Sequence, residues 1–301
     1  MRLKPSMRLK PNARHNPKPN PRQNADQVII LKSPAELRIM REAGLVVART
    51  VRELVASMKP GMSTKDLDDI ALASFNRQDA VSTAYKYPPG GPNPFPGRVC
   101  ISVNDEIVHG IPKSRMRINQ GDLVKFDIAA QHKGYCGDTT LSATVGGKPT
   151  EEQAFVMAVA YGGLMAGINA ARVGNRLSDI GHAIQTFVES KGLLVVQEFV
   201  GHGVGRSMHE PPQVSHYGDP GRGPALRAGM VLAIEPQVNL GGREVRMLSD
   251  GWTAVTVDGS LSAHYEHTVA ITPDGPVILT EPEEGMVSDE ERLIQRLAAE
   301  I

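Results

Sequence analysis

Four acidic residues and one histidine have the types and spacing of a metal site. The acidic residues lie on or beside strand-like runs, where a charge is disfavoured unless it is paired or bound to a cation. The histidine lies in a glycine-rich segment that lets the backbone approach a ligand. The five residues are Asp127, Asp138, His202, Glu235 and Glu266.

An oxygen-rich donor set with one imidazole suits two divalent metal ions bridged by carboxylates. It favours cobalt, manganese or iron over a thiolate type of zinc site, with zinc as a further option. Two such ions about 3.5 to 4 Å apart can hold a hydroxide at neutral pH and stabilise developing negative charge. The expected chemistry is hydrolysis, although each residue taken alone also fits a structural or surface role.

The spacing of Asp127 and Asp138 predicts a hairpin that brings them together. A turn is indicated at residues 131–134. A two-residue loop of His132 and Lys133 would place the two aspartates directly opposite each other, about 5 Å apart. A register shift of one residue would send them to opposite faces, so this prediction depends on the parity of the hairpin.

Two further histidines lie beside turn or proline signals. His109 occurs in VHGIP and His209 in MHEPP. Either imidazole could hydrogen-bond a substrate, and a surface or core histidine is the alternative for each. The glycine spacing at 201–205 does not indicate a nucleotide site, because no strand-turn-helix unit with a downstream acid accompanies it.

Helices and strands follow one another in an order that occurs twice. Capping residues and apolar periodicity predict helices over 33–58, 64–77, 150–172 and 178–191. Apolar alternation predicts antiparallel strands over 99–145 and strands again over 192–280. A further capping box is indicated at 288–291.

The two parts also resemble each other in sequence. GDLVKFD at 121–127 and GMVLAIE at 229–235 share a glycine, an apolar centre and a carboxylate six residues after the glycine. Gly61 and Gly174 stand at the same distance before Asp-Leu and Asp-Ile pairs. We expect an α+β fold from a duplication of about 110 residues, with chance likeness of amphipathic strands as the alternative.

Charge separates the amino terminus from the rest of the 301-residue chain. Residues 1–25 carry seven basic and no acidic residues, which leaves 26 basic against 33 acidic residues elsewhere. We expect residues 1–32 to form a disordered, proline-rich extension that could attract a phosphate-rich partner, or simply a solvated tail. The extension lacks a secretory signal, no stretch approaches the roughly 18 apolar residues of a membrane span, and two cysteines cannot build a disulfide framework. A soluble protein of a reducing compartment is the expectation.

Several segments resemble the type I methionine aminopeptidases, pita-bread metallopeptidases that remove the initiator methionine from new proteins. The likeness covers about residues 33–282. It rests on CISVNDEIVHGIP (100–112), the FD and GDTT pair (126–140), GHGVGRSMHEPPQV (201–214), AIEP (233–236) and WTAVTVDGSLSAHYEHTVAIT (252–272). It implies a pita-bread catalytic domain over 33–301, with two pseudo-symmetric halves of antiparallel sheet and outer helices.

The resemblance also implies roles for the residues above. The five candidate donors would be the ligands of the two metal ions, and Glu235 would also shuttle a proton. His109 and His209 would position substrate and stabilise the tetrahedral intermediate. The implied reaction is attack of a metal-held hydroxide on the bond after the initiator methionine of a nascent polypeptide, with a preference for a small second residue.

The methionine pocket departs from the usual pattern of this family. Phe95, Cys100 and Trp252 match pocket positions, but Phe95 stands where a tyrosine is common and Met208 replaces an aromatic residue. Residues 85–97 are longer and richer in proline than usual, so Tyr85 and Tyr87 cannot be aligned. An apolar slot closed by Phe95, Cys100 and Trp252 could hold an unbranched thioether, and ordinary core packing is the alternative for all three.

Two other functions fit parts of the pattern. A proline-directed peptidase of the same fold usually carries an additional amino-terminal domain, which 32 polar residues cannot supply. A pita-bread protein that binds RNA or ribosomes without catalysis need not keep five ligands. We therefore expect a cytoplasmic, monomeric exopeptidase whose basic extension could contact the ribosome.

Overall fold

The computed structural model describes residues 28–146 and 148–301. The predicted disorder and ribosome contact of the extension fall largely outside this part of the chain. Five helices are described, and α1, α3 and α5 have the predicted capping boxes. A further box at Ser63 precedes α2, and Arg176 before α4 has a carboxylate of Asp179 on its backbone N–H. The helices are α1 (Pro34–Ser57), α2 (Thr64–Arg77), α3 (Glu151–Ala170), α4 (Leu177–Ser190) and α5 (Asp289–Glu300).

The strands form one large antiparallel sheet and two small ones. The large sheet has the order β1-β4-β5-β14-β9-β7-β8, with β15 paired to β14 and β2 paired to β4. The small sheets have the orders β13-β10-β6 and β11-β12-β3. The strands are β1 (Val81–Ser82), β2 (Cys100–Val103), β3 (Glu106–Val108), β4 (Leu123–His132), β5 (Tyr135–Thr144), β6 (Leu194–Val195), β7 (Gly201–Gly203), β8 (Glu210–Val214), β9 (Val231–Ile234), β10 (Gln237–Asn239), β11 (Val245–Met247), β12 (Ala254–Thr256), β13 (Ser262–His264), β14 (Glu266–Thr272) and β15 (Gly275–Ile278).

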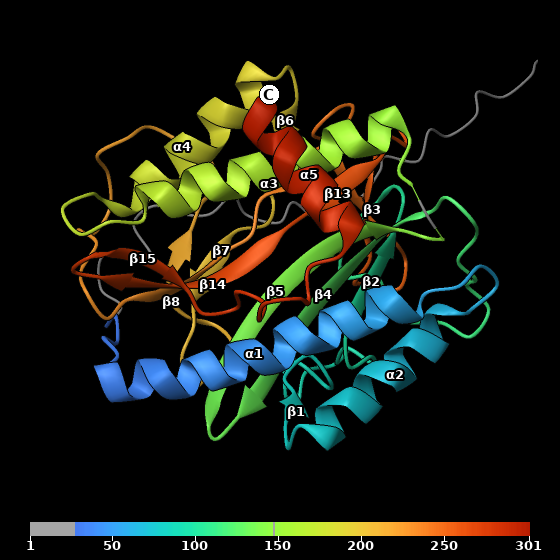
Figure 1. Ribbon diagram of the computed structural model, residues 1–301, viewed down its shortest axis with the longest axis horizontal. Helices are drawn as coiled ribbons and strands as arrows, with labels where there is room; N and C mark the ends of the chain where they lie inside the picture. The colour runs from blue at the N-terminus through green and yellow to red at the C-terminus, as the bar shows by residue number, and fades with distance from the viewer. Residues whose placement is uncertain (1–27, 147) are drawn as a thin grey trace, which may run out of the picture.

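Helices of each half cover that half of the sheet. In Figure 1, α1 lies along β4 and β5 with α2 beside it, and α3 and α4 lie together over the strands of the second half. The terminal helix α5 crosses α3. The expected pita-bread fold, two similar halves with an antiparallel sheet and outer helices, is confirmed.

Matching backbone hydrogen bonds relate the two halves. Gly121 donates to the carbonyl of Val145 at 3.0 Å, and Gly229 donates to that of Ile271 at 2.9 Å. Both glycines have positive φ, at 85° and 90°. Isolated bridges repeat the relation at the helix starts, since Ser63 pairs with Arg117 before α2 and Arg176 with Ala225 before α4. The repeated order therefore reflects one scaffold used twice.

The predicted loop of the β4–β5 hairpin is wrong by one residue. Its two loop residues are Lys133 and Gly134, both with positive φ, as a type I′ turn requires. Asp127 consequently faces Thr140 and not Asp138, which faces Ala129. The register shift is two residues, so parity is kept and the two aspartates still share one face of the sheet.

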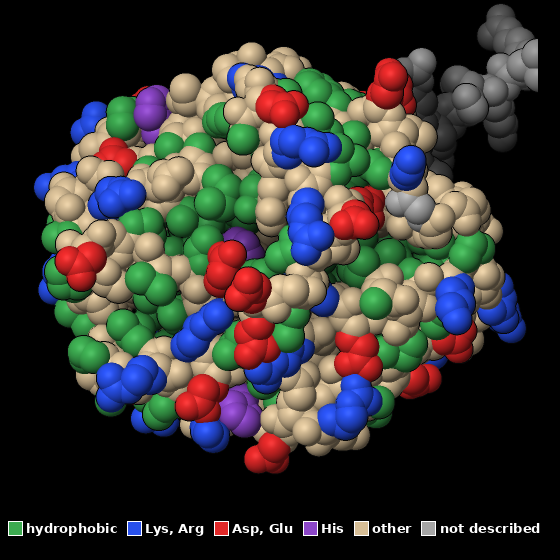
Figure 2. All heavy atoms as spheres, in the orientation of Figure 1, with side chains coloured by type: hydrophobic (Ala, Val, Ile, Leu, Met, Phe, Trp, Pro, Cys, Tyr) green, Lys and Arg blue, Asp and Glu red, His purple; other side chains and the backbone are tan. Residues whose placement is uncertain are grey.

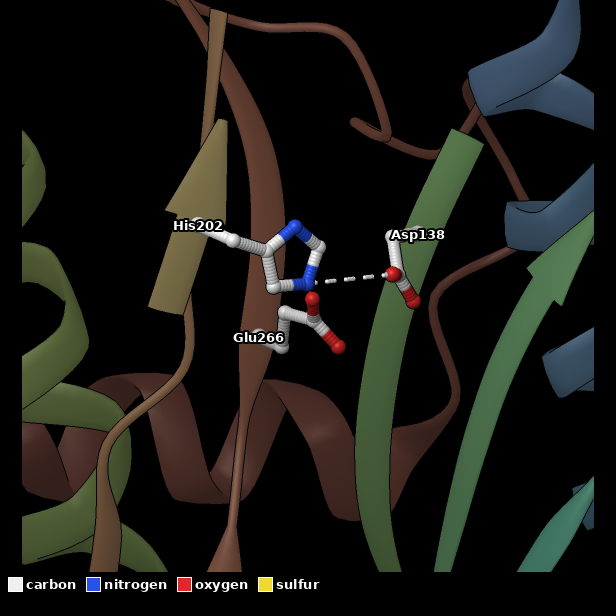
Figure 3. A group of neighbouring side chains, drawn as sticks. All are labelled: Asp138, His202 and Glu266. Atoms are coloured by element: carbon white, nitrogen blue, oxygen red, sulfur yellow. Dashed lines mark ion pairs between the residues drawn. The ribbon is translucent and has the colours of Figure 1, made fainter. Parts of the chain in front are cut away.

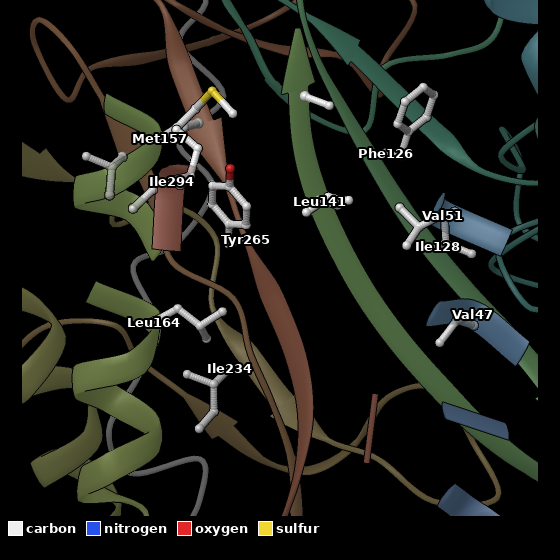
Figure 4. Packing of buried hydrophobic residues seen from close by; sticks show 14 of the residues in the cluster. Val47, Val51, Phe126, Ile128, Leu141, Met157, Leu164, Ile234, Tyr265 and Ile294 are labelled. Carbon is white, nitrogen blue, oxygen red and sulfur yellow. The ribbon is translucent and has the colours of Figure 1, made fainter. Parts of the chain in front are cut away.

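A continuous apolar core joins the helices to the sheet. Val47 and Val51 of α1 pack toward Ile128 of β4, and Leu164 of α3 packs toward Ile234 of β9 (Figure 4). All five are at most 1% exposed. Burying each such side chain contributes about 1.5–3 kcal/mol, so the core fixes the strand positions on which the candidate site depends.

Helix α3 is apolar on most of its surface because it is a core helix. Among the described residues, α3 alone meets the length and composition criteria of a membrane span, with 61% of its apolar window buried inside the protein. It packs against α4 and α5 and against strands of the second half. The core helix of a soluble protein satisfies the same criteria, so α3 is weak evidence for a membrane.

Charges of both signs are interspersed on the helix-covered face (Figure 2). Surface ion pairs include Arg49 with Glu283, joined at 2.7 Å.

Lys32, which the sequence assigns to the extension, instead belongs to the folded body. Its backbone N–H donates to the carbonyl of Gly229 at 2.7 Å, and the residue is 7% exposed.

Candidate metal centre

The five predicted donors come from five successive positions across the large sheet. Asp127 lies on β4, Asp138 on β5, Glu266 on β14 and His202 on β7, and Glu235 directly follows β9. These strands are neighbours in the order β4-β5-β14-β9-β7. Antiparallel pairing thus brings together side chains that span 140 positions of the sequence.

The donor atoms lie close enough to share a cation. One donor atom each from Asp138, His202 and Glu266 lies within 4.8 Å of the other two (Figure 3). Nε2 of His202 is 3.7 Å from Oδ2 of Asp138 and 3.6 Å from Oε1 of Glu235. Nδ1 of His202 is 3.0 Å from the carbonyl oxygen of Gly203, which orients the ring and turns Nε2 toward the carboxylates.

Burial and mutual repulsion make these carboxylates unfavourable as anions without a cation. Burial raises the pKa of Asp127 to about 6. Burial and then neighbouring carboxylates raise the pKa values of Asp138, Glu235 and Glu266 well above their usual range. Burial lowers the pKa of His202 to about 3, so its imidazole is neutral at pH 7. A neutral imidazole among four carboxylates is a donor set that a divalent ion would stabilise.

Hydrogen bonds from a second layer of residues hold the donors. Oγ1 of Thr140 donates to Oε2 of Glu266 at 2.9 Å. Nε2 of Gln237 donates to Oε2 of Glu235 at 3.2 Å, and the backbone N–H of Glu235 donates to Nε2 of His216 at 3.2 Å. Sequence reasoning missed these three partners. Only Thr140 carried a readable signal, because it belongs to the GDTT segment.

All ten residues singled out by the sequence line one cavity of about 300 Å³. The donors lie at one side of this cavity together with both histidines, and three apolar positions predicted for the pocket complete the set. The ten are Phe95, Cys100, His109, Asp127, Asp138, His202, His209, Glu235, Trp252 and Glu266. The cavity is also lined by Tyr87, Phe199 and Met208, which were not assigned a role.

The two histidines outside the donor set have different surroundings. His109 has φ of 59° and packs edge-on against Phe199 and Trp252, with ring centroids 5.3 and 6.2 Å away. Burial lowers the pKa of His109 to about 4. His209 packs edge-on against His202 at 4.3 Å, and its Nδ1 is 2.7 Å from the hydroxyl of Tyr87. Burial lowers the pKa of His209 as well. Both rings are therefore neutral at pH 7.

Residues 85–97 form a wall of the cavity and are tied to the second half of the chain. Nε1 of Trp252 donates to the carbonyl of Asn93 at 3.0 Å, and the rings of Phe95 and Trp252 meet edge-on at 5.3 Å. Phe95 donates to the carbonyl of Tyr87 at 2.7 Å. These contacts hold Tyr87 beside His209. The sequence alone did not allow Tyr87 to be aligned with a family position.

The apolar part of the cavity contains a cysteine and a methionine. Cys100 is 7% exposed, and burial raises the pKa of its thiol well above the usual value, so it is protonated. Oγ1 of Thr83 donates to the sulfur of Met208 at 3.1 Å. Together with Phe95 and Trp252, these side chains give a slot of aromatic edges and sulfur next to the donors.

Comparisons with known proteins agree with this geometry. The family model described as metallopeptidase family M24 matches residues 38–273. The chain is 50% identical over 253 residues to methionine aminopeptidase 1 of Bacillus subtilis, covering 84% of this chain and 99% of that protein. It is 40% identical over 253 residues to methionine aminopeptidase of Escherichia coli, covering 84% and 94%.

Solved structures show the same relation. The crystal structure of methionine aminopeptidase from Thermotoga maritima matches with a TM-score of 0.80 and 41% identity, covering 84% of this chain and 100% of that one. A prolidase from Pyrococcus furiosus matches with a TM-score of 0.66 at 22% identity, which supports the fold alone. This chain belongs to metallopeptidase family M24 and, within it, to the methionine aminopeptidases.

Proposed function

We propose that this protein removes the amino-terminal methionine from nascent polypeptides and uses the cavity described above as its active site. The observation that carries the proposal is the convergence of five donors, two neutral histidines and an apolar slot on one cavity. The relatives named above are aminopeptidases, which supports a reaction at the free end of a chain.

The donor set fits two divalent metal ions. His202 lies near Asp138, Glu235 and Glu266, and these four would hold one ion. Asp127 would hold the second ion together with Asp138 and Glu266. Besides burial, the charge of Asp127 contributes to the raised pKa values of both of these carboxyl groups, which agrees with their being close together. Cobalt, manganese and iron suit this set best, and zinc is the further candidate. When bound, the ions would lower the pKa of a water molecule and polarise the scissile carbonyl.

The side chains of this chain then bind, orient and transfer a proton. Glu235 would take a proton from the nucleophile and deliver it to the leaving amine. His109 and His209, both neutral, would donate hydrogen bonds to the oxygen that gains charge and to the substrate amide. Phe95, Cys100 and Trp252 would hold the methionine side chain, since a flexible thioether packs well against aromatic edges.

The setting of the reaction follows from its substrate. The confined cavity favours a small second residue, because a larger one must find room beside the donors. Because nascent polypeptides emerge in the cytosol, we expect the enzyme to act there. We also expect it to be a monomer. The basic residues 1–25 would aid encounter with ribosomes, which predicts salt-sensitive co-sedimentation that is lost when these residues are deleted.

One assay tests the proposed activity. Metal-replete protein is incubated with Met-Ala-Ser and with Ala-Pro-Gly, and the released amino acid is identified. Release of methionine from the first peptide alone is expected. Release of alanine from the second peptide alone would favour a proline-directed peptidase, and full activity of metal-stripped protein would reject the mechanism.

A further inference from the structure

A buried ion pair joins the start of the folded body to the loop that carries His209. Nζ of Lys32 is 2.7 Å from Oε2 of Glu210. The two side chains are 4% and 8% exposed, so both charges are shielded from water. Nζ of Lys32 also donates to the carbonyl of Ile30 at 3.0 Å. The pair spans 178 residues of sequence, and neither partner has a role in the proposed chemistry.

The other oxygen of the Glu210 carboxylate closes the turn before His209. Oε1 of Glu210 accepts hydrogen bonds from the backbone N–H groups of Arg206 at 2.8 Å and Ser207 at 3.3 Å. A Cβ atom on Gly205 would lie 2.2 Å from the same oxygen, so the carboxylate is packed against the backbone of the turn. The carboxylate therefore fixes residues 205–207, and Lys32 fixes the carboxylate.

Cys136 donates to the carbonyl of Gly205 at 2.8 Å and Gln131 to that of Arg206 at 3.0 Å, which ties one side of this turn to the β4–β5 hairpin, but the β7–β8 pairing on its other side is irregular. In the β7–β8 ladder, His202 pairs with Gln213 and the next residue, Gly203, pairs with Glu210. This irregularity leaves two residues of β8 without a partner on β7, so the ladder is interrupted where the loop begins. His209 immediately precedes Glu210, and its ring packs at 4.3 Å against the donor His202. Small movements of the turn would thus move the ring of His209 relative to the site.

We propose that Lys32 is a positioning residue for His209 and acts through Glu210. The ammonium group holds the carboxylate, the carboxylate holds the turn, and the turn aims the imidazole into the cavity. This proposal rests on the proposed role of His209. It also assigns a function to the last residue of the segment that links the amino-terminal extension to the body.

The test compares two buried ion pairs. In the full-length protein, Lys32→Met keeps the length of the side chain and removes its charge. Arg52→Met is the matched control, because Arg52 pairs with Glu291 at 2.6 Å with side-chain exposures of 13% and 8%, between α1 and α5. Each variant is assayed with Met-Ala-Ser for kcat and KM, for bound metal by calorimetry, and for Tm.

We expect both variants to lose about 5–10 °C in Tm, since each leaves a buried charge unpaired. Lys32→Met should in addition lower kcat by about tenfold, with KM changed less than about twofold and two metal ions still bound. Arg52→Met should keep the kcat of the unmodified protein. Equal kcat values for the two variants would overturn the proposal.

Chemical rescue separates positioning from folding. Propylammonium replaces the atoms lost in Lys32→Ala, so it should restore at least half of the lost kcat, whereas the neutral 1-propanol should not. Rescue by neither compound, or by both equally, would contradict a role for the ammonium charge. If the unmodified protein itself releases no methionine, the proposed function fails; a fully active Lys32→Met variant rejects only the positioning role.

Discussion

The segments that carry the two cavity histidines occupy matching places in the two halves. Residues 100–112 and 200–212 have equal length, with histidine at the tenth position and proline at the thirteenth in both. The first begins on β2, which pairs with β4, and the second begins one residue before β7, which pairs with β9. His109 and His209 are thus structural counterparts on one scaffold.

The two segments are held by different lysines. In the first half, Nζ of Lys125 donates to the carbonyl of Asn104 at 2.7 Å, and Lys125 is 1% exposed on β4. In the second half, Lys32 holds Glu210 from a segment that precedes the first helix. The first half therefore supports its histidine segment from within, whereas the second depends on residues from the opposite end of the chain.

The donor set shows a second divergence between the halves. Asp127 and Glu235 stand six residues after equivalent glycines, Gly121 and Gly229. Opposite Asp127 stands Thr140, while the pairing of His267 with Ile234 places Glu266 beside Glu235. The two halves thus share a frame but contribute unequal donors, two aspartates from the first half and two glutamates and one histidine from the second.

The largest effect is expected where both halves contribute to the same ions. Asp138→Ala should lower kcat/KM by about a thousandfold or more and abolish binding of both metal ions, because its carboxylate would be shared. Asp127→Ala should retain one ion, since it would serve one position only. Elemental analysis and calorimetry give the stoichiometry. Two ions bound to Asp138→Ala would show that the halves do not share ligands.

Replacing either cavity histidine should have the next largest effect. His109→Ala and His209→Ala should each lower kcat about a hundredfold, as expected for loss of a hydrogen-bond donor to a developing oxyanion. Tyr87→Phe should lower kcat about tenfold by acting through His209, because the hydroxyl of Tyr87 is hydrogen-bonded to Nδ1 of that ring. A Tyr87→Phe effect that is unchanged in a His209→Ala background would contradict this coupling.

Acid should weaken the folded metal-free protein through His109. Its pKa falls from 6.5 in the unfolded chain to about 4 when folded, so the unfolded state binds more protons between these values. The stabilising contribution is present above pH 6.5 and is lost as the pH falls toward 4. Between pH 6.5 and pH 4, the free energy of unfolding of His109→Asn should therefore fall by about 2 kcal/mol less than that of the unmodified protein. Urea titrations at several pH values measure it.

The smallest contrast lies in two equivalent glycines. Gly121→Ala should cost about 1 kcal/mol, because its φ is positive and no atom lies within 4 Å of the added Cβ. Gly229→Ala should cost about 2–3 kcal/mol, because the Cβ would also meet the carbonyl oxygen of Lys32 at 2.8 Å. Urea unfolding checks both. Equal costs would show that Lys32 moves aside freely.

Local signals predicted the scaffold and the donors, while contacts between distant residues determined the rest. Caps, alternation and repeated glycines were sufficient for the helices and the two halves. The hairpin loop was misplaced because His132 was given a turn position that Gly134, with its positive φ, occupies. That error was avoidable, since a type I′ turn favours glycine at its second position.

The cavity wall and Lys32 carried no such local signal. Asn93 is held by Trp252, 159 residues away, and this contact fixes a loop whose own sequence is compatible with many conformations. Lys32 followed a proline-rich, basic segment and looked solvated, yet Glu210 on the far side of the sequence buries it. Burial decided by a remote partner is not visible in composition.

The confined size of the cavity bears on when the reaction can take place. A space of about 300 Å³ admits one side chain and the backbone next to it, and no compact surface can follow. A protein whose first residues have already packed into its own fold could not insert its amino terminus into this cavity. Removal of methionine would therefore compete with folding of the substrate protein. A substrate that buries its amino terminus early would keep its methionine.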